Sequence, residues 1–227
     1  MKLLKEHELI WSDIVANNNM NRKRKASGVN SYEKNLKFKP EVYLNGCLEQ
    51  QEQIKWLDLC CGEGNALLQY AHELAGRGMQ DRARLRGIDL VNQFQPVPAW
   101  ISCLQWETGS LVDWTADDQY DLITCVHGLH YIGDKLKVIT EALKAISPKG
   151  MLIANLDLKS IKVEGDADNN MLKRLFGEYQ VEYNVRRKII SCNGPRDLVI
   201  NLTYKGADDQ AGPNYTGQNA VDAYYHT

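Results

Sequence analysis

Apolar runs of strand length alternate with apolar residues at helical spacing along most of this chain. The runs lie at residues 53–60, 84–91, 103–111, 120–128 and 151–158. Helical spacing is found from Asn65 to Ala75 and from Ile132 to Ile146. A strand followed by a helix, repeated, is typical of a parallel sheet covered by helices on both faces. We therefore expect a doubly wound α/β fold.

The pattern changes near both ends of the chain. Residues 179–191 and 197–206 read as two strands, and Cys192-Asn193-Gly194-Pro195 between them has the composition of a hairpin turn. Apolar residues at helical spacing over 3–15, and a shorter helix that opens with Pro40, predict a helical start. The expected fold is a seven-stranded, mostly parallel sheet with a C-terminal antiparallel hairpin and an N-terminal helical extension.

This pattern divides the chain into three parts. We expect an N-terminal helical lid or extension over 1–52, a main domain over 53–205 and a polar C-terminal tail over 206–227. Within the first part, residues 17–31 are polar and read as a connector, and the basic run RKRK at 22–25 is expected to be a solvated face. The C-terminal tyrosines either cap the substrate side of a site or belong to a loose tail.

Composition narrows the classes of partner. The 227 residues are 44% hydrophobic and 25% charged, and the net charge is −2, so no basic field favours nucleic acid or an anionic membrane. No apolar run reaches the roughly twenty residues that span a bilayer, and the N-terminus lacks a signal-peptide pattern. We expect a cytoplasmic protein with reduced cysteines. The adjacent Cys60 and Cys61 lack the spacing of a zinc site, and no metal is expected.

The stretch WLDLCCGEGNALL, residues 56–68, carries the candidate chemistry. It is an apolar strand that ends in a carboxylate, Asp58, and turns through two glycines, Gly62 and Gly64, into a helix. Glycines in such a turn let the backbone approach a ligand closely. A carboxylate is unsuited to a phosphate cradle, because it repels a pyrophosphate.

The region from Trp56 to Asp157 resembles the class I methyltransferases that use S-adenosylmethionine (SAM). In that family the first strand leads into Asp-x-Gly-x-Gly-x-Gly, and here the motif runs from Asp58 to Gly64 with Cys60 in place of the first glycine. An acid closes the second strand (Asp89), and a small polar turn follows the third (Gly109-Ser110). The fourth strand leads into "VHGLHYIGD", and a Pro-x-Gly turn precedes the fifth. Five features in this order are more specific than any one of them.

The resemblance implies a role for each matching residue. Asp58 would face the cationic methionine end of SAM, Asp89 would accept hydrogen bonds from the ribose hydroxyls, and the backbone at Ser110 would read the adenine. Tyr32 would help to close a lid over the cofactor. The implied cofactor contacts are Asp58, Cys60, Gly62, Gly64, Asp89, Leu90, Ser110, Leu111 and Tyr32.

Two histidines after the fourth strand are the candidate catalytic residues. If the acceptor arrives protonated, His127 or His130 has a suitable pKa range for a general base. His130 is equally well read as a core histidine. The turn "VHGLH" lacks the Asn/Asp-Pro-Pro-aromatic pattern of enzymes that methylate nucleic-acid bases. We expect transfer to an oxygen or nitrogen of a small molecule or peptide.

Two other functions remain open from the sequence. A SAM-binding scaffold without turnover would carry the same motifs. A nicotinamide-dependent oxidoreductase would need Gly-x-Gly-x-x-Gly, and here Leu67 stands where the third glycine belongs. The sequence does not determine the oligomeric state.

Overall fold

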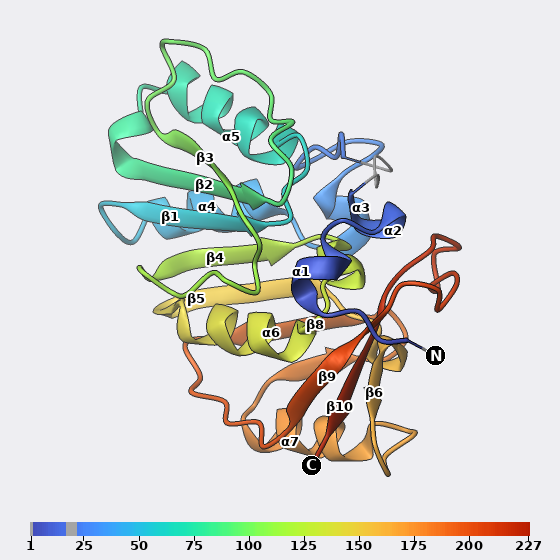
Figure 1. Cartoon of the computed structure of the whole chain (residues 1–227). Coiled ribbons are helices and arrows are strands. Elements are labelled where there is room, and N and C mark those ends of the chain that lie inside the picture. The colour runs from blue at the N-terminus through green and yellow to red at the C-terminus, as the bar shows by residue number, and fades with distance from the viewer. Residues whose placement is uncertain (1, 17–21) are drawn as a thin grey trace.

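The computed structural model describes residues 2–16 and 22–227. Its main sheet has seven strands in the order β3-β2-β1-β4-β5-β8-β7 (Figure 1). The strands β1 to β5 are parallel to one another, and β8 and β7 form the antiparallel hairpin at one edge. The expected fold class is therefore confirmed. The strand bounds are β1 Ile54–Leu59, β2 Ala83–Asp89, β3 Leu104–Thr108, β4 Tyr120–Cys125, β5 Ile146–Asn155, β7 Glu182–Asn184 and β8 Ile189–Asn193.

Helices cover both faces of this sheet. Adjacent residues of β1 show the two sides. Trp56 belongs to a hydrophobic cluster with residues of α3 (Tyr32–Leu36), α4 (Pro40–Leu48) and α5 (Asn65–Gly76), while Leu57 belongs to a cluster with residues of α6 (Lys135–Lys144) and α7 (Asn170–Glu178). Because the side chains of a strand alternate between its faces, each short apolar strand contributes side chains to two hydrophobic cores, one on each face of the sheet. The single-turn 3-10 helices are Gln80–Arg82, Gly128–Tyr131 and Leu158–Ser160. None of the described helices is long and apolar enough to cross a membrane.

The hairpin lies earlier in the chain than its expected position. We expected its turn at Cys192-Asn193-Gly194-Pro195, but the chain turns between β7 and β8, where the Asn184 side chain accepts a hydrogen bond from Arg187 N at 3.0 Å and Lys188 takes a left-handed φ of 55°. Gly194 instead donates to Gly150 O at 2.8 Å and extends the pairing with β5. The side chain of Asn184 therefore makes the turn that we had assigned to Asn193-Gly194.

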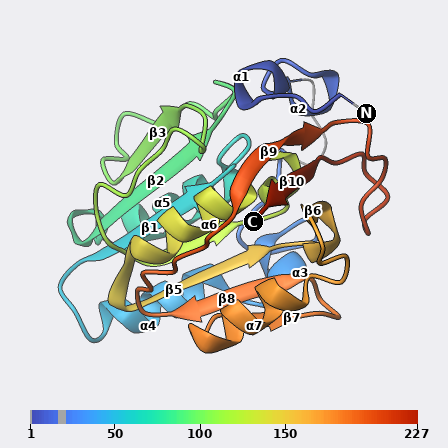
Figure 2. The same cartoon turned by 60° about the horizontal axis from the view of Figure 1, so that its bottom comes forward.

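A second, three-stranded sheet contains the last two strands of the chain. It has the order β6-β10-β9, with β6 at Ile161–Val163, β9 at Thr203–Asp208 and β10 at Asp222–His226. Figure 2 shows β9 and β10 on the α6 side of the main sheet. The segment expected as a polar tail, 206–227, thus includes a strand whose Ala223 and Tyr225 are buried.

The N-terminal residues pack against this second sheet. The helix expected over 3–15 is two single-turn helices, α1 (Glu6–Leu9) and α2 (Asp13–Ala16), and Leu4 forms an antiparallel bridge with Ala207 of β9. The connector expected at 17–31 lies partly outside the described residues. From Arg22 onward it runs across the carboxyl end of β1, where Glu63 N donates to Arg22 O at 3.0 Å.

Candidate active site

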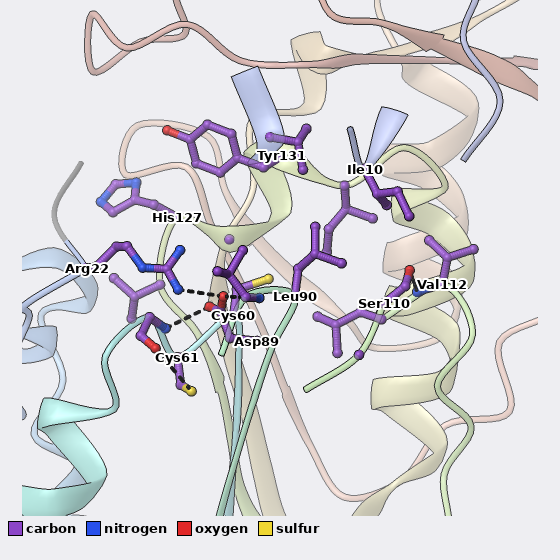
Figure 3. A pocket seen from close by; sticks show the side chains of 18 of the residues that line it. Ile10, Arg22, Cys60, Cys61, Asp89, Leu90, Ser110, Val112, His127 and Tyr131 are labelled. Atoms are coloured by element: carbon purple, nitrogen blue, oxygen red, sulfur yellow. Dashed lines mark hydrogen bonds and ion pairs between the residues drawn. The ribbon is translucent and has the colours of Figure 1, made fainter. Parts of the chain in front are cut away.

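A pocket lies at the carboxyl ends of β1, β2 and β4, beneath α1 and α2 (Figure 3). Open parallel sheets bind ligands at this edge. Seven of the nine expected cofactor contacts line the pocket, namely Tyr32, Cys60, Gly62, Asp89, Leu90, Ser110 and Leu111. Asp58 and Gly64 do not line the pocket. Asp58 is fully buried, and a Cβ on Gly64 would lie 2.2 Å from the ring of Trp106.

The turn after β1 has the backbone that glycine favours. Cys60, which stands where the family has glycine, takes a left-handed φ of 55°, and Gly62 takes 64°. A Cβ on Gly62 would lie 2.7 Å from Arg22 O, so the N-terminal segment passes directly over this glycine. The absence of a side chain at Gly62 therefore makes room for the chain's own backbone, in addition to any ligand.

Asp89 lies on the pocket floor with both carboxylate oxygens in hydrogen bonds. Oδ2 accepts from Gly62 N at 2.8 Å, and Oδ1 accepts from Arg22 Nη2 at 2.8 Å and from Val91 N at 3.2 Å. The expectation that residues 22–25 form a solvated face is thus wrong for Arg22, whose side chain is only 12% exposed. The exposed residues of the run are Lys23 and Lys25, while Arg22 and Arg24 line the pocket. Arginine and lysine already alternate at 22–25 in the sequence, in step with the pocket-lining and exposed side chains of the structure.

Asp58 is the second strand-end carboxylate and is fully buried. Its Oδ2 accepts from the Tyr32 hydroxyl and its Oδ1 from the Thr124 hydroxyl, both at 2.6 Å. Trp56 Nε1 in turn donates to Thr124 Oγ1 at 2.8 Å. Burial raises the pKa of the Asp58 carboxyl to about 7, although the two hydrogen bonds lower it. Tyr32 lines the pocket and donates to Asp58, so Asp58 positions this tyrosine.

The two candidate histidines have different surroundings. His127 lines the pocket, and its Nε2 lies 2.8 Å from Asn35 Oδ1. Asn35 Nδ2 donates to Ser31 O at 2.7 Å, which fixes the amide so that Oδ1 faces the imidazole. Nε2 of His127 must therefore carry the proton, and Nδ1 is the ring nitrogen that can accept one. Burial lowers the pKa of His127 to about 3, so the ring is neutral at pH 7.

His130 lies outside the pocket lining and is 1% exposed. Its ring centroid is 5.5 Å from that of His127 and 5.4 Å from that of Tyr215. Neither ring nitrogen has a hydrogen-bond partner among the described residues. Burial lowers the pKa of His130 to about 3 as well, so it packs behind His127 as a neutral ring.

The C-terminal loop between β9 and β10 supplies residues that the sequence did not reveal. Gln218 lines the pocket and accepts a hydrogen bond from the Tyr131 hydroxyl at 3.0 Å. Tyr215 lies 6.3 Å from His127, ring centre to ring centre. Of the two interpretations of the C-terminal tyrosines, Tyr215 fits a cap on the site, whereas Tyr225 belongs to the core. No short motif marks this loop, because its position depends on the pairing of β10 with β6 and β9.

The polar and apolar groups that line the pocket suit SAM. The carboxylate of Asp89 suits ribose hydroxyls, Ser110 and Leu111 line the pocket, and Leu90 and Val112 offer apolar surface for a flat base. Figure 3 shows Arg22 and Asp89 facing one another, with Ser110 and Val112 toward one end and His127 toward the other. Among the described residues, no group of three or more His, Cys, Asp or Glu could hold a metal ion.

Comparison with known proteins identifies the family. A family model described as a methyltransferase domain matches residues 32–192, more than half of the chain. A relative from Arabidopsis thaliana, the chloroplastic 2-phytyl-1,4-beta-naphthoquinone methyltransferase, is 26% identical over 111 residues, which are 44% of this chain and 40% of the relative. The match thus spans less than half of that relative's length.

Two solved structures are similar to part of the chain. A SAM-dependent methyltransferase from Thiobacillus denitrificans in complex with S-adenosyl-L-homocysteine is 22% identical, with 52% of this chain and 48% of that chain covered and a TM-score of 0.38. The CurJ carbon methyltransferase is 12% identical, with 67% and 52% covered and a TM-score of 0.46. The match of the family model to residues 32–192 is what decides the assignment. The chain belongs to the methyltransferase domain family.

Proposed function

We propose that this enzyme transfers the sulfonium methyl of SAM to an oxygen or nitrogen of a small-molecule or peptide acceptor by in-line displacement. The observation that carries the proposal is the pocket that joins Asp89 and Ser110 to His127 and Tyr131. A cofactor bound along the strand ends would present its methyl group toward His127 and Tyr131.

We place the cofactor by its chemical groups. Asp89 holds the ribose hydroxyls, the backbone at Ser110 and Leu111 holds the adenine, and the methionine portion lies over Cys60 and Gly62. The ribose takes the place of the Arg22 guanidinium on Asp89, because both would bind the same oxygen. SAM supplies an activated methyl group, so the protein has only to orient the reactants and exclude water.

The N-terminal extension supplies the acceptor side. Ile10 and Val15 line the pocket from the helical extension, and Ile132 and Tyr131 line it from the segment after β4. We therefore assign residues 1–52, as far as they are described, the role of the lid over the domain at 53–205. An acceptor with an apolar body fits these side chains, and closure over it keeps the reaction dry.

His127 is the candidate general base for a protonated acceptor. Its Nδ1 can accept a proton, while Asn35 holds the ring in place through Nε2. A pKa near 3 makes His127 a weak base in the free enzyme. When His127 takes up a proton, the bound cofactor and acceptor would have to stabilise the positive charge on its ring. We assign His130 a supporting role, because its ring packs behind that of His127.

The test is a screen for product. The purified chain is incubated with SAM and pools of metabolites, peptides and reduced quinones, the last because the Arabidopsis relative is a naphthoquinone methyltransferase, and release of S-adenosylhomocysteine is measured. Calorimetry with SAM, against NAD as a control, runs in parallel. Turnover on an oxygen or nitrogen acceptor supports the proposal. Methylation of carbon would contradict the assigned acceptor atom, and tight SAM binding with no turnover on any pool would favour a scaffold.

A further inference from the structure

Cys60, on the turn after β1, carries a side chain where the backbone favours glycine. Its φ is 55°, in the left-handed region, where a Cβ costs free energy that glycine does not lose. Glycine is also the residue that the family motif has at this position. Strain of this kind gathers at functional sites, which points to a use for the Cys60 thiol.

The sulfur of Cys60 faces a second cysteine, Cys125, at the end of β4. Both sulfurs lie against Gly128: the position of a Cβ on this glycine is 2.7 Å from Cys60 Sγ and 2.9 Å from Cys125 Sγ. The side chains of the two cysteines share a hydrogen bond. The sulfur of the adjacent Cys61 lies instead 2.8 Å from the position of a Cβ on Gly87, in β2. The two neighbouring cysteines therefore point to different strands, and Cys60 is the one that faces Cys125.

The spacing of the two strands suits a disulfide between these cysteines, which are both free thiols. The parallel register of β1 and β4 pairs Asp58 with Thr124. One residue further along, Leu59 lies beside Cys125, and Cys60 follows directly. Neighbouring strands are about 4.8 Å apart, and the Cα atoms of a disulfide are about 4.4–6.8 Å apart. The strands therefore need not separate for the bond to form.

The two cysteines differ in access. Cys60 is half-buried and lines the pocket, whereas Cys125 is 1% exposed. A small oxidant that enters the pocket therefore meets Cys60 first. The hydrogen bond with Cys125 and burial raise the pKa of the Cys60 thiol well above its usual range, so the reactive thiolate is scarce near neutral pH. We expect slow oxidation, which responds to a sustained supply of oxidant.

We propose that Cys60 and Cys125 are a redox-sensitive pair, which a peroxide links in a reversible disulfide when the pocket holds no SAM. The Cys60 thiolate attacks one peroxide oxygen, the O–O bond breaks and one water leaves, so that Cys60 becomes a sulfenic acid. The Cys125 sulfur then attacks the Cys60 sulfur, the S–O bond breaks, and a second water carries away the Cys125 proton. Two electrons pass from the two sulfurs to the peroxide, and a dithiol reverses the bond.

Protection by SAM rests on the proposed function, in which the methionine portion of the cofactor lies over Cys60 and Gly62. Bound there, SAM would close the route from the pocket to the Cys60 sulfur. The disulfide itself depends on the two cysteines alone. Oxidation would therefore select the chains that hold no cofactor.

The test follows the disulfide in the full chain treated with hydrogen peroxide. Remaining thiols are alkylated, the protein is digested, and mass spectrometry identifies the linked peptides. We expect a link between Cys60 and Cys125 that dithiothreitol removes. SAM at about 100 times its Kd leaves about 1% of the chains unloaded, so the rate of linking should fall by at least about tenfold.

Three cysteine variants sharpen the test. Cys60→Ser should form no link. Cys125→Ser should form none either, and should instead accumulate a sulfenic acid on Cys60 that dimedone labels. Cys61→Ser is the matched control, because Cys61 lines the same pocket with its sulfur turned toward β2. It should form the link at the rate of the parent.

Separate results would overturn each part of the inference. Cysteines that stay reduced, or that link Cys60 to Cys61, would contradict the pair. Linking that proceeds only in urea would assign the bond to the unfolded chain and would contradict the pair as well. An unchanged rate with SAM bound, as shown by calorimetry, would contradict the protection. Failure of SAM to bind would contradict the proposed function, while the peroxide experiment without SAM still decides on the pair.

Discussion

The pocket has a floor and a cover that are built in different ways. The floor consists of the pocket-lining residues at the strand ends, 60–62, 89–91, 109–112 and 126–128, and the cover consists of the described residues of 2–36 together with the loop 209–221. Backbone pairing within one parallel sheet fixes the floor. The cover is held to the floor and its supports by side chains: Arg22 binds Asp89, Tyr32 binds Asp58 and Asn35 binds His127.

The cover engages the same strand-end side chains that the sequence predicts for the site. Each contact joins a residue of the cover to a carboxylate or imidazole at the end of β1, β2 or β4. Cofactor binding and cover closure are therefore linked through shared partners, and a ligand on Asp89 changes the contacts of Arg22. Changes at the junction of floor and cover should have larger effects than changes within either part.

The largest effect is expected from Gly62→Val. The Cβ of the new side chain would lie only 2.7 Å from Arg22 O, and valine would also strain a φ of 64°. We expect loss of measurable SAM binding by calorimetry. Gly78 has a similar φ of 65° with open space around it, so Gly78→Val should cost only the backbone strain of about 1–3 kcal/mol in thermal unfolding and leave SAM binding intact. Retained SAM binding in folded Gly62→Val would show that floor and cover do not meet there.

The next effect is on the pH dependence of stability through Asp58. Its pKa rises from the ordinary 3.8 to about 7 on folding, so the folded state keeps a proton that the unfolded state has lost. This group's contribution therefore favours folding at low pH and is lost as pH rises from about 4 to 7. Over that window the loss amounts to about 4 kcal/mol, at about 1.4 kcal/mol per pKa unit.

Asp58→Asn removes this titration and retains an acceptor for one of the two hydroxyls. The measurement is urea unfolding of parent and variant at several pH values between 4 and 8. We expect the variant to gain stability relative to the parent as pH rises through this window. His127 and His130 titrate in both proteins, so the difference isolates Asp58. A difference that does not depend on pH would mean that Asp58 is charged throughout.

A smaller effect is expected at the ribose contact. Asp89→Asn keeps an oxygen for Gly62 N but loses the charge that the ribose hydroxyls would meet. SAM should bind about 1.5–3 kcal/mol more weakly by calorimetry, the usual scale for a charged hydrogen bond. The exposed Asp113, changed to Asn, serves as a control. A 2′-deoxyribose analogue of SAM should lose less affinity in the variant than in the parent, and simply additive losses would place the ribose elsewhere.

The smallest effect is expected from Arg22→Gln. The guanidinium binds Asp89 in the structure, so removing it should make SAM bind more tightly, by about 1 kcal/mol, the net scale of one hydrogen bond that the ribose no longer has to displace. Lys23→Gln removes the same charge from an exposed neighbour and should change nothing. Weaker SAM binding in Arg22→Gln alone would mean that Arg22 contributes to holding the cofactor instead of competing with it.

The sequence predicted the floor well because local patterns determine it. A strand-length apolar run followed by Asp or by a glycine turn defines a strand end, and parallel strands place these ends side by side; β2 ends at Asp89 as expected. The left-handed φ of Cys60 explains why the family uses glycine there.

The cover could not be predicted in the same way, because its contacts join segments that are far apart in the sequence. The polarity of residues 22–31 is the same whether an arginine faces solvent or a carboxylate, and only the alternation of Arg22 and Arg24 with the exposed lysines distinguishes the two cases. Likewise, the turn at Asn184 and the β10 strand depend on pairing partners, so composition assigned one hairpin to the wrong residues and described a paired strand as a tail.

The pairing of the N-terminal segment with β9 sets an order for assembly during synthesis. Lys5 Nζ donates to Lys205 O across 200 residues, and Leu4 pairs with Ala207. At about 5–20 residues per second, the ribosome makes the partner of this segment roughly 10–40 seconds after the segment itself. Throughout that interval the sheet can form while α1 lacks the strand on which it rests. The complete cover of the pocket is therefore a late feature of the nascent chain, present only when β9 and β10 have emerged.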